Sequence, residues 1–158
     1  METEDISLFI IAGSLSSVRN EAWENGVGSE PDRVEAASPL IVVIEDEAIV
    51  LAGYQMLFES WGYRVAAAQS VDEAITQLEA FGEAPRFILA DYRLKAGRTG
   101  IEAIEIVRRI HGAAIPAVLV TGDTAVDRLR HAAASGLPIL HKPVNGRQLQ
   151  ELLRRAIG

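Results

Sequence analysis

Short apolar runs alternate with amphipathic segments from Leu40 to the end of the chain, and this alternation limits the fold more than any other feature. The first run, 40–44, contains only Leu, Ile and Val, which is typical of a strand buried on both faces. Further strands are predicted at 63–67, 87–90, 115–120 and 137–140. Because strands that alternate with helices form parallel sheets, the pattern predicts an α/β fold with a doubly wound, five-stranded parallel sheet.

The segments between and after these strands have helical periodicity. Helices are predicted at 48–61, 70–81, 101–110, 123–134 and 145–157. One face of the first helix is expected to carry Ile49, Ala52, Gly53, Met56 and Leu57.

Capping residues mark several of these helix ends. Ser70, followed three residues later by Glu73, resembles a capping box. Asp123 and Asn145 are predicted to cap the N-termini of the last two helices. Gly62 suits the end of the first helix.

Residues 1–39 mix one short apolar patch, 8–12, with Ser, Gly, Asn and Glu, and they have no sustained period. We expect a poorly ordered N-terminal leader here, followed by a domain at 40–158. The patch is far too short to cross a membrane. The residues before it are acidic, where a signal peptide would be basic. A cytoplasmic protein that does not associate with membranes is therefore expected.

The composition excludes several kinds of chemistry. The chain of 158 residues has no cysteine, which excludes disulfides, thiolate metal sites and cysteine catalysis. Its formal net charge is −7 and its sequence pI is about 5.0. Direct nucleic-acid binding is not expected, because it requires clustered Lys and Arg.

Polar residues follow four of the five predicted strands: Glu45 and Asp46 the first, Asp91 the third, Thr121 the fourth and Lys142 the fifth. The carboxyl ends of parallel strands meet at one edge of the sheet, where ligands bind. Three carboxylates at that edge repel one another, and Mg²⁺, which prefers oxygen ligands, would relieve the repulsion. A lysine and a hydroxyl suit an incoming phosphoryl group, so Asp91 is the candidate nucleophile that forms an acyl phosphate.

From Leu40 to Gly158 the chain resembles the receiver domain of two-component response regulators. The resemblance rests on the acidic pair Glu45-Asp46, the lone Asp91, Thr121 before a small residue, and the Lys142-Pro143 step. It is nearest in character to the receivers of hybrid sensor histidine kinases. It implies the flavodoxin-like (βα)5 fold and a signalling module rather than an enzyme. Such a module phosphorylates itself from a kinase phosphohistidine and later loses the phosphoryl group by autodephosphorylation.

The resemblance also implies roles for individual residues. Asp91 would be the phosphoacceptor, and Asp46 and Asp91 would ligate Mg²⁺ directly. Glu45 would act largely through water, and the backbone carbonyl of Arg93 would be a further ligand.

Two more residues would bind the phosphoryl group. Lys142 would pair with a phosphoryl oxygen, and the Lys142–Pro143 peptide bond would be cis. Thr121 would move toward the phosphoryl group and carry its loop along. The expected partner is a histidine kinase or a histidine phosphotransfer protein, and the last helices could form a homodimer.

The chain departs from the family pattern in two places. The loop 92–100 lacks the proline commonly found there and has one residue more than usual before Gly100. Ile139 stands where the family often has Tyr or Phe, three residues before the lysine. The usual rotamer change of that aromatic ring cannot operate here, so the output surface must signal differently or weakly.

Other interpretations stay open. A pseudo-receiver, which keeps the fold and binds partners without phosphorylation, is the alternative function. A phosphatase of the haloacid-dehalogenase type would need a second Asp where Arg93 stands. Purely structural roles are also conceivable, since Glu45-Asp46 could favour a helix dipole and residues 121–123 could form a turn and cap. His141 is expected to be an exposed residue at a strand end.

Overall fold

The computed structural model describes residues 38–157 of the chain. The leader expected at 1–39 therefore lies outside the described residues, apart from its last two. The five strands are β1 (Leu40–Ile44), β2 (Arg64–Ala68), β3 (Phe87–Asp91), β4 (Ala117–Thr121) and β5 (Ile139–His141). They form one parallel sheet in the order β2-β1-β3-β4-β5. The predicted five-stranded, doubly wound fold is confirmed.

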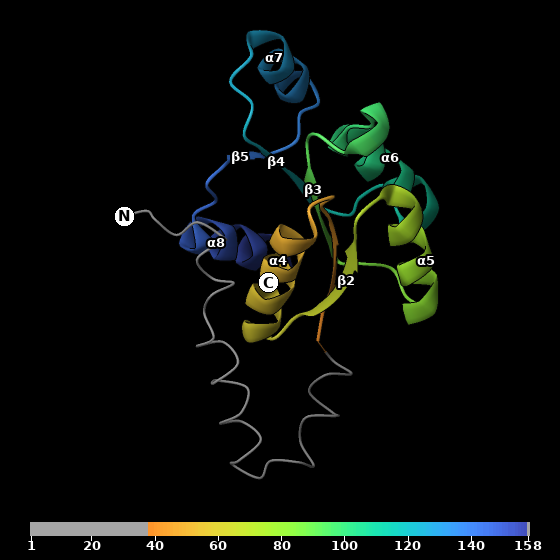
Figure 1. Ribbon diagram of the computed structural model, residues 1–158. Helices are drawn as coiled ribbons and strands as arrows, with labels where there is room; N and C mark the ends of the chain where they lie inside the picture. The colour runs from red at the N-terminus through yellow and green to blue at the C-terminus, as the bar shows by residue number, and fades with distance from the viewer. Residues whose placement is uncertain (1–37, 158) are drawn as a thin grey trace, which may run out of the picture.

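Helices cover both faces of this sheet (Figure 1). They are α4 (Ala48–Ser60), α5 (Val71–Phe81), α6 (Gly100–His111), α7 (Val126–Ala134) and α8 (Gly146–Ile157), with a short 3₁₀ turn, η1, at Lys95–Gly97. Buried side chains of α4 and α8 share one hydrophobic cluster, and those of α5 and α6 share the other. Helix α7 adds only Ala132 to the second cluster.

The first strand shows why its sequence has no polar residue. Side chains alternate between the faces of a strand. Ile41 and Val43 pack in the cluster with α4 and α8, whereas Leu40, Val42 and Ile44 pack in the cluster with α5 and α6. All five side chains are fully buried. A polar side chain at any of these positions would lose its contact with water without gaining a hydrogen bond, which would destabilise the fold.

Strand boundaries differ slightly from the prediction. Strand β4 begins at Ala117 rather than Ile115, because Pro116 has no N–H to donate to a neighbouring strand. Its carbonyl still accepts a hydrogen bond from the Ile88 N–H at 3.0 Å. Strands β3 and β4 each extend one residue further, so that Asp91 and Thr121 are their last residues.

Most predicted helix ends are confirmed. The Ser70 hydroxyl accepts a hydrogen bond from the Glu73 N–H at 3.1 Å, and Asn145 caps α8 by accepting one from the Gln148 N–H at 3.0 Å. Gly62 follows α4 with φ +95, a conformation that favours glycine.

The predicted cap at Asp123 is wrong. Helix α7 begins at Val126, and the residue at its N-cap is Ala125, whose side chain makes no capping hydrogen bond. Asp123 lies in the loop before the helix, where its carboxylate pairs with Arg93 at 3.2 Å instead. Asp123 therefore forms an ion pair with a residue of a distant loop and does not cap the helix.

The buried face predicted for the first helix is also partly wrong. Gly53 and Leu57 are buried, but Ile49 is 68% exposed and Ala52 is exposed. The buried face of α4 instead consists of Leu51, Gly53, Tyr54, Leu57 and Phe58. Rotating the helix in this way buries two aromatic rings, which remove more apolar area from water than Ile49 and Ala52 would.

Within residues 38–157 no helix combines the length and apolar character that crossing a membrane requires.

Candidate functional site

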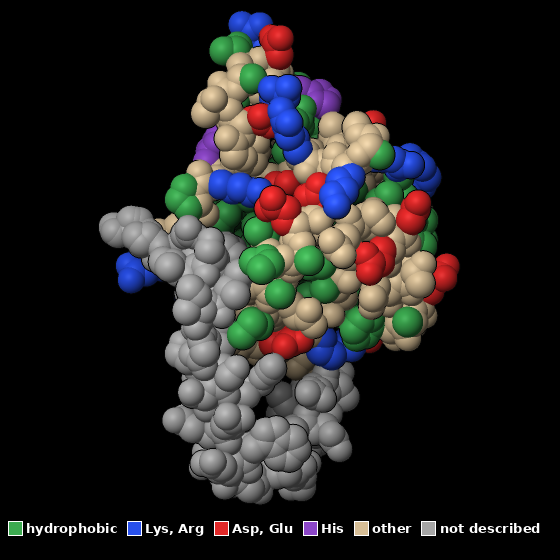
Figure 2. Space-filling model, viewed as in Figure 1, with side chains coloured by type: hydrophobic (Ala, Val, Ile, Leu, Met, Phe, Trp, Pro, Cys, Tyr) green, Lys and Arg blue, Asp and Glu red, His purple; other side chains and the backbone are tan. Residues whose placement is uncertain are grey.

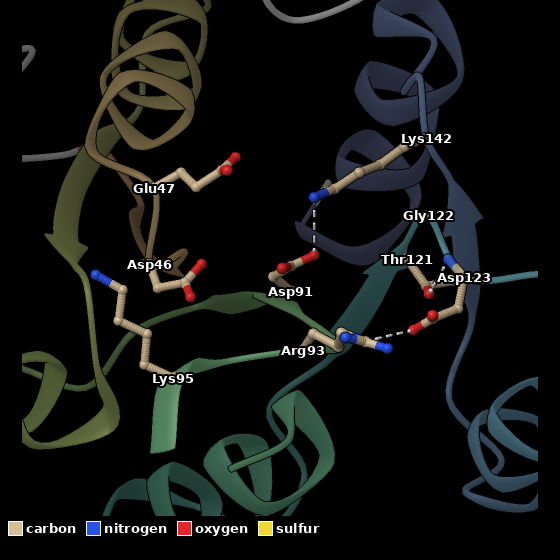
Figure 3. A pocket seen from close by; sticks show the side chains of 9 residues that line it. All are labelled: Asp46, Glu47, Asp91, Arg93, Lys95, Thr121, Gly122, Asp123 and Lys142. Atoms are coloured by element: carbon tan, nitrogen blue, oxygen red, sulfur yellow. Dashed lines mark hydrogen bonds and ion pairs between the residues drawn. The ribbon is translucent and has the colours of Figure 1, made fainter. Parts of the chain in front are cut away.

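A pocket of about 560 Å³ lies at the carboxyl edge of the sheet. Figure 3 shows the residues that line it, which are Asp46, Glu47, Asp91, Arg93, Lys95, Thr121, Gly122, Asp123 and Lys142. They come from the last residues of β3 and β4 and from the loops after β1, β3, β4 and β5. Glu45 does not line the pocket but lies beside it, in one acidic cluster with Asp46 and Asp91. The parallel sheet thus brings together all the strand-end residues that the sequence singled out.

Two carboxylates that line the pocket, those of Asp46 and Asp91, form its floor, and the buried carboxylate of Glu45 lies beside them. Glu45, Asp46 and Asp91 each have an oxygen within 4.8 Å of the others. Glu45 is only 1% exposed; its Oε2 accepts a hydrogen bond from the Glu47 N–H at 3.0 Å. Its Oε1 is buried and has no hydrogen-bond partner among the described residues. A buried oxygen of this kind, in a set of hard oxygen donors, fits Mg²⁺, which binds through carboxylates and water.

The pKa values of Glu45 and Asp91 show that these carboxylates repel one another and are poorly solvated. Burial, and then the charge of Asp91, raise the pKa of Glu45 from 4.5 to about 7. Burial likewise raises the pKa of Asp91, although Lys142 offsets part of that effect. Two neighbouring carboxylates with raised pKa values mark a site where added positive charge is stabilising.

Lys142 supplies positive charge from the opposite wall. Its Nζ lies 3.2 Å from Asp91 Oδ1 and 3.9 Å from Glu45 Oε1. Desolvation lowers the pKa of the ammonium group, but Asp91 and Glu45 outweigh it, so the pKa of Lys142 rises. Lys142 therefore stays charged at neutral pH. The predicted cis peptide bond between Lys142 and Pro143 is confirmed.

Thr121 ends β4 beside the floor. Its side chain is buried, and its Oγ1 accepts a hydrogen bond from the Asp123 N–H at 3.0 Å. The Asp123 carboxylate pairs with Arg93 Nε at 3.2 Å and with Arg128 at 3.7 Å. The loop that carries the hydroxyl is thus held to the loop that follows Asp91.

The loop after Asp91 folds back on itself. Arg93 and Thr99 form an antiparallel bridge, and Ala96 has φ +63, a conformation uncommon for a residue with a side chain. The loop closes at Gly100, whose N–H donates to the Tyr92 carbonyl at 2.8 Å. A Cβ at Gly100 would overlap the Asp91 carbonyl, so only glycine fits at this position.

Tyr92 links the strand of Asp91 to α7. Its ring is 5% exposed, and its hydroxyl forms a 2.7 Å hydrogen bond with His131 Nδ1. The two rings meet edge to face with centroids 5.8 Å apart. His131 is exposed on α7 and has this specific partner. His141 is exposed at the end of β5, as predicted.

Sequence reasoning missed part of the pocket wall. Glu47 and Lys95 line it, and so does Asp123, which had been assigned to a helix cap. The side chain of Arg93 also belongs to the wall, although the sequence suggested only its backbone carbonyl as a ligand. One feature of the sequence could have indicated two of these residues: Arg93 lies two residues after Asp91, and Asp123 lies two residues after Thr121. Figure 2 shows a group of acidic side chains with basic side chains above it and on both sides.

The fold and the site together define a CheY-like, flavodoxin-type α/β signalling domain. The chain belongs to the response regulator receiver domain family, which matches residues 41–154. Receiver domains of this family act in two-component signalling, as the sequence resemblance implied.

Curated relatives support the same family. The transcriptional regulatory protein ZraR of Salmonella typhimurium is 30% identical over 119 residues, which cover 75% of this chain and 26% of ZraR. ZraR of Escherichia coli K12 has the same identity and coverage. The chain thus spans about a quarter of the length of these relatives.

Solved structures agree with the fold. A response regulator receiver protein from Pseudomonas putida is 26% identical with a TM-score of 0.65, and the match covers 75% of this chain and 98% of that one. A CheY-like receiver domain from Methanospirillum hungatei has a TM-score of 0.65 at 23% identity, covering 77% of this chain and 94% of its own.

Proposed function

We propose that this domain is a phosphoacceptor receiver in which Asp91 takes a phosphoryl group in a Mg²⁺-dependent reaction. The observation that carries the proposal is the position of the Asp91 carboxylate. It lies at the end of a central strand, within 4.8 Å of oxygens of Glu45 and Asp46 on one side and 3.2 Å from Lys142 on the other. Three carboxylates and a cation thus lie close together, which supports the roles proposed for them as nucleophile, metal ligands and phosphoryl-binding group.

The residues divide the chemistry between them. An Asp91 oxygen would attack the phosphorus of a phosphohistidine or a small acyl phosphate; the new O–P bond forms as the bond to the leaving group breaks. Asp46 and Asp91, the carbonyl of Arg93 and, through water, Glu45 would hold Mg²⁺, which neutralises charge on the phosphoryl oxygens and the carboxylates. Lys142 would bind another phosphoryl oxygen. Positioning and charge neutralisation account for most of the catalysis of phosphoryl transfer.

Thr121 would transmit the new state of Asp91. In the unphosphorylated structure its hydroxyl accepts a hydrogen bond from the Asp123 N–H. A phosphoryl oxygen is a strong acceptor, so the hydroxyl would turn and donate to it. That movement would shift the loop leading into α7.

The proposal extends to the partners. The phosphoryl donor would be a histidine kinase or a histidine phosphotransfer protein, and the two would meet in the cytoplasm. ZraR is named as a transcriptional regulator, but for this chain we propose no direct contact with nucleic acid, in keeping with the net charge of −7 of the full sequence. Residues 40–158 would act as the receiver unit behind a leader at 1–39, and self-association through the last helices stays a prediction.

The test is the incorporation of one phosphoryl group. The full chain is incubated with Mg²⁺ and a small acyl-phosphate donor, and its intact mass is measured. We expect a gain of one phosphoryl group that is lost in Asp91→Asn and without Mg²⁺, and kept in Asp72→Asn. Asp72 is a suitable matched control because it is exposed in the first turn of α5. Equal labelling of Asp91→Asn and wild type would refute the assignment.

The pseudo-receiver is the alternative that the sequence left open on account of Ile139 and the altered loop. Ile139 is partly buried against the hydrophobic cluster of α5 and α6, at the position where an aromatic ring would be needed for the usual readout. Under this alternative the wild type would gain no mass from either a small donor or a kinase. It would bind its partner equally tightly with and without Asp91. Loss of partner binding in Asp91→Asn would speak against it.

A further inference from the structure

Arg93 has a side chain that the proposed chemistry does not yet use. It is the second residue after Asp91 and lines the same pocket. Figure 3 shows it extending toward Asp123, and its Nε lies 3.2 Å from Asp123 Oδ2. The side chain is 58% exposed, so it is free to move at the mouth of the pocket.

Asp123 connects Arg93 to the loop that carries Thr121. Its carboxylate side chain is 14% exposed and also pairs with Arg128 at 3.7 Å. Its backbone N–H donates to the Thr121 hydroxyl at 3.0 Å. In this state one residue therefore binds both the arginine and the hydroxyl.

Phosphorylation would change the balance of charge around Arg93. The Asp91 carboxylate carries one negative charge, whereas a phosphoryl group on it would carry roughly two, with three strong acceptor oxygens. These oxygens would project from Asp91 into the pocket that Arg93 lines. A guanidinium group binds phosphate oxygens in two-point geometry, and a phosphoryl group offers it more negative charge and more acceptor oxygens than the Asp123 carboxylate does. Asp123 and a phosphoryl group would thus compete for the same arginine.

We propose that Arg93 is a further phosphoryl-binding residue, which Asp123 holds in reserve until Asp91 is phosphorylated. This inference rests on the proposed function. When Arg93 exchanges Asp123 for the phosphoryl group, the loop from Thr121 to Asp123 loses its tie to the loop after Asp91. The exchange gives the site a way to move the segment before α7 without an aromatic ring at position 139.

A purely structural ion pair predicts something different. If Arg93 and Asp123 only stabilise the two loops, removing either one has the same effect on the site, because the same interaction is lost. If they compete with the phosphoryl group, removing them has opposite effects. Arg93→Gln removes a phosphoryl ligand, whereas Asp123→Asn releases that ligand.

Beryllofluoride, which imitates a phosphoryl group on aspartate, provides a binding readout without turnover. Its affinity for the full chain is measured with Mg²⁺ by titration calorimetry and by ¹⁹F NMR of the bound species. We expect Arg93→Gln to bind it about three- to tenfold more weakly and Asp123→Asn about two- to fivefold more tightly, the range that a partly exposed charged pair allows. Arg93→Lys, which keeps the charge, should recover part of the loss.

Two further variants complete the design. Arg128→Gln is the matched control, because Arg128 pairs with the same Asp123 carboxylate but does not line the pocket. The affinity of this variant for beryllofluoride should stay within about twofold of that of the wild type. The double variant Arg93→Gln/Asp123→Asn should bind like Arg93→Gln. Unfolding midpoints of all variants are compared first, so that a misfolded protein is recognised.

Each result decides between the possibilities. Weaker binding in both single variants, or tighter binding that persists in the double variant, would overturn the role of Arg93 while leaving the phosphoacceptor function intact. A wild type that neither binds beryllofluoride nor gains a phosphoryl group would overturn the proposed function, and this inference with it.

Discussion

Replacing Glu45 by Gln should stabilise the metal-free domain at pH values above neutral. The side chain is 1% exposed, and one of its oxygens has no hydrogen-bond partner among the described residues. Its carboxylate faces the charge of Asp91, which with burial raises its pKa. Gln has nearly the same shape and can keep the hydrogen bond from the Glu47 N–H. The substitution therefore removes a buried charge without opening a cavity.

The size of the effect follows from the pKa of Glu45, which rises from 4.5 to about 7 on folding. Since the pKa is raised in the folded state, this group's contribution to stability is fully present below pH 4.5 and is lost as the pH rises through about 7. A difference of this size corresponds to about 3 kcal/mol in full, of which roughly 2 kcal/mol falls between pH 5 and pH 8, because Glu45 is already partly ionised at pH 5 in the unfolded chain. Glu45→Gln should therefore match wild type near pH 5 and exceed it by roughly 2 kcal/mol near pH 8.

Urea unfolding of both proteins without Mg²⁺, near pH 5 and near pH 8, measures this difference. Glu79→Gln is the matched control, because Glu79 is exposed on α5 and the same change there should not alter the pH dependence. Adding Mg²⁺ near pH 8 should stabilise the wild type more than Glu45→Gln, which has lost one carboxylate of the cluster. A variant that is equally destabilised at both pH values would refute the reasoning, because the effect of the substitution would then not depend on the ionisation of Glu45.

Three other substitutions test contacts around the site. Lys142→Ala removes the ammonium 3.2 Å from Asp91 and should slow labelling by a small acyl phosphate about 10- to 100-fold in a mass time course; an unchanged rate would contradict its role. Gly100→Ala places a methyl group against the Asp91 carbonyl and should lower the free energy of unfolding by about 2–4 kcal/mol in urea, whereas an unchanged midpoint would show that the loop can shift. Tyr92→Phe removes the hydroxyl bonded to His131 and should cost about 1 kcal/mol, a loss that should disappear when the same change is made in a His131→Ala background.

The sheet and the floor of the pocket could be predicted from the sequence because they depend on general rules. The β-branched run at 40–44 requires burial on both faces, and parallel strands must end at a common edge. These two rules are enough to place Asp46, Asp91 and Lys142 together. They say nothing about the distances between the side chains, which is why the roles of these residues stay predictions.

Tertiary contacts account for what the sequence did not reveal. Asp123 has the residue type and position of a helix cap, and its local sequence cannot show that an arginine from another loop reaches it. Ile49 looked like a core residue because its spacing fits a helical face, but Tyr54 and Phe58 determine which face of α4 is buried. The hydrogen bond between Tyr92 and His131 joins residues 39 positions apart and has no sequence signature.

Helix α7 lies at one end of the molecule in Figure 1, with Ala132 as its single buried residue and Val126 60% exposed. Little apolar area is released when such a helix opens, so its amides should exchange with solvent through local opening, far more often than those of β1 and β3. A protein that packs onto α7 would suppress this opening and lose conformational entropy by doing so. Its affinity would then depend on how ordered the helix already is, and any change at Asp91 that orders or loosens α7 would alter that affinity without touching the contact surface.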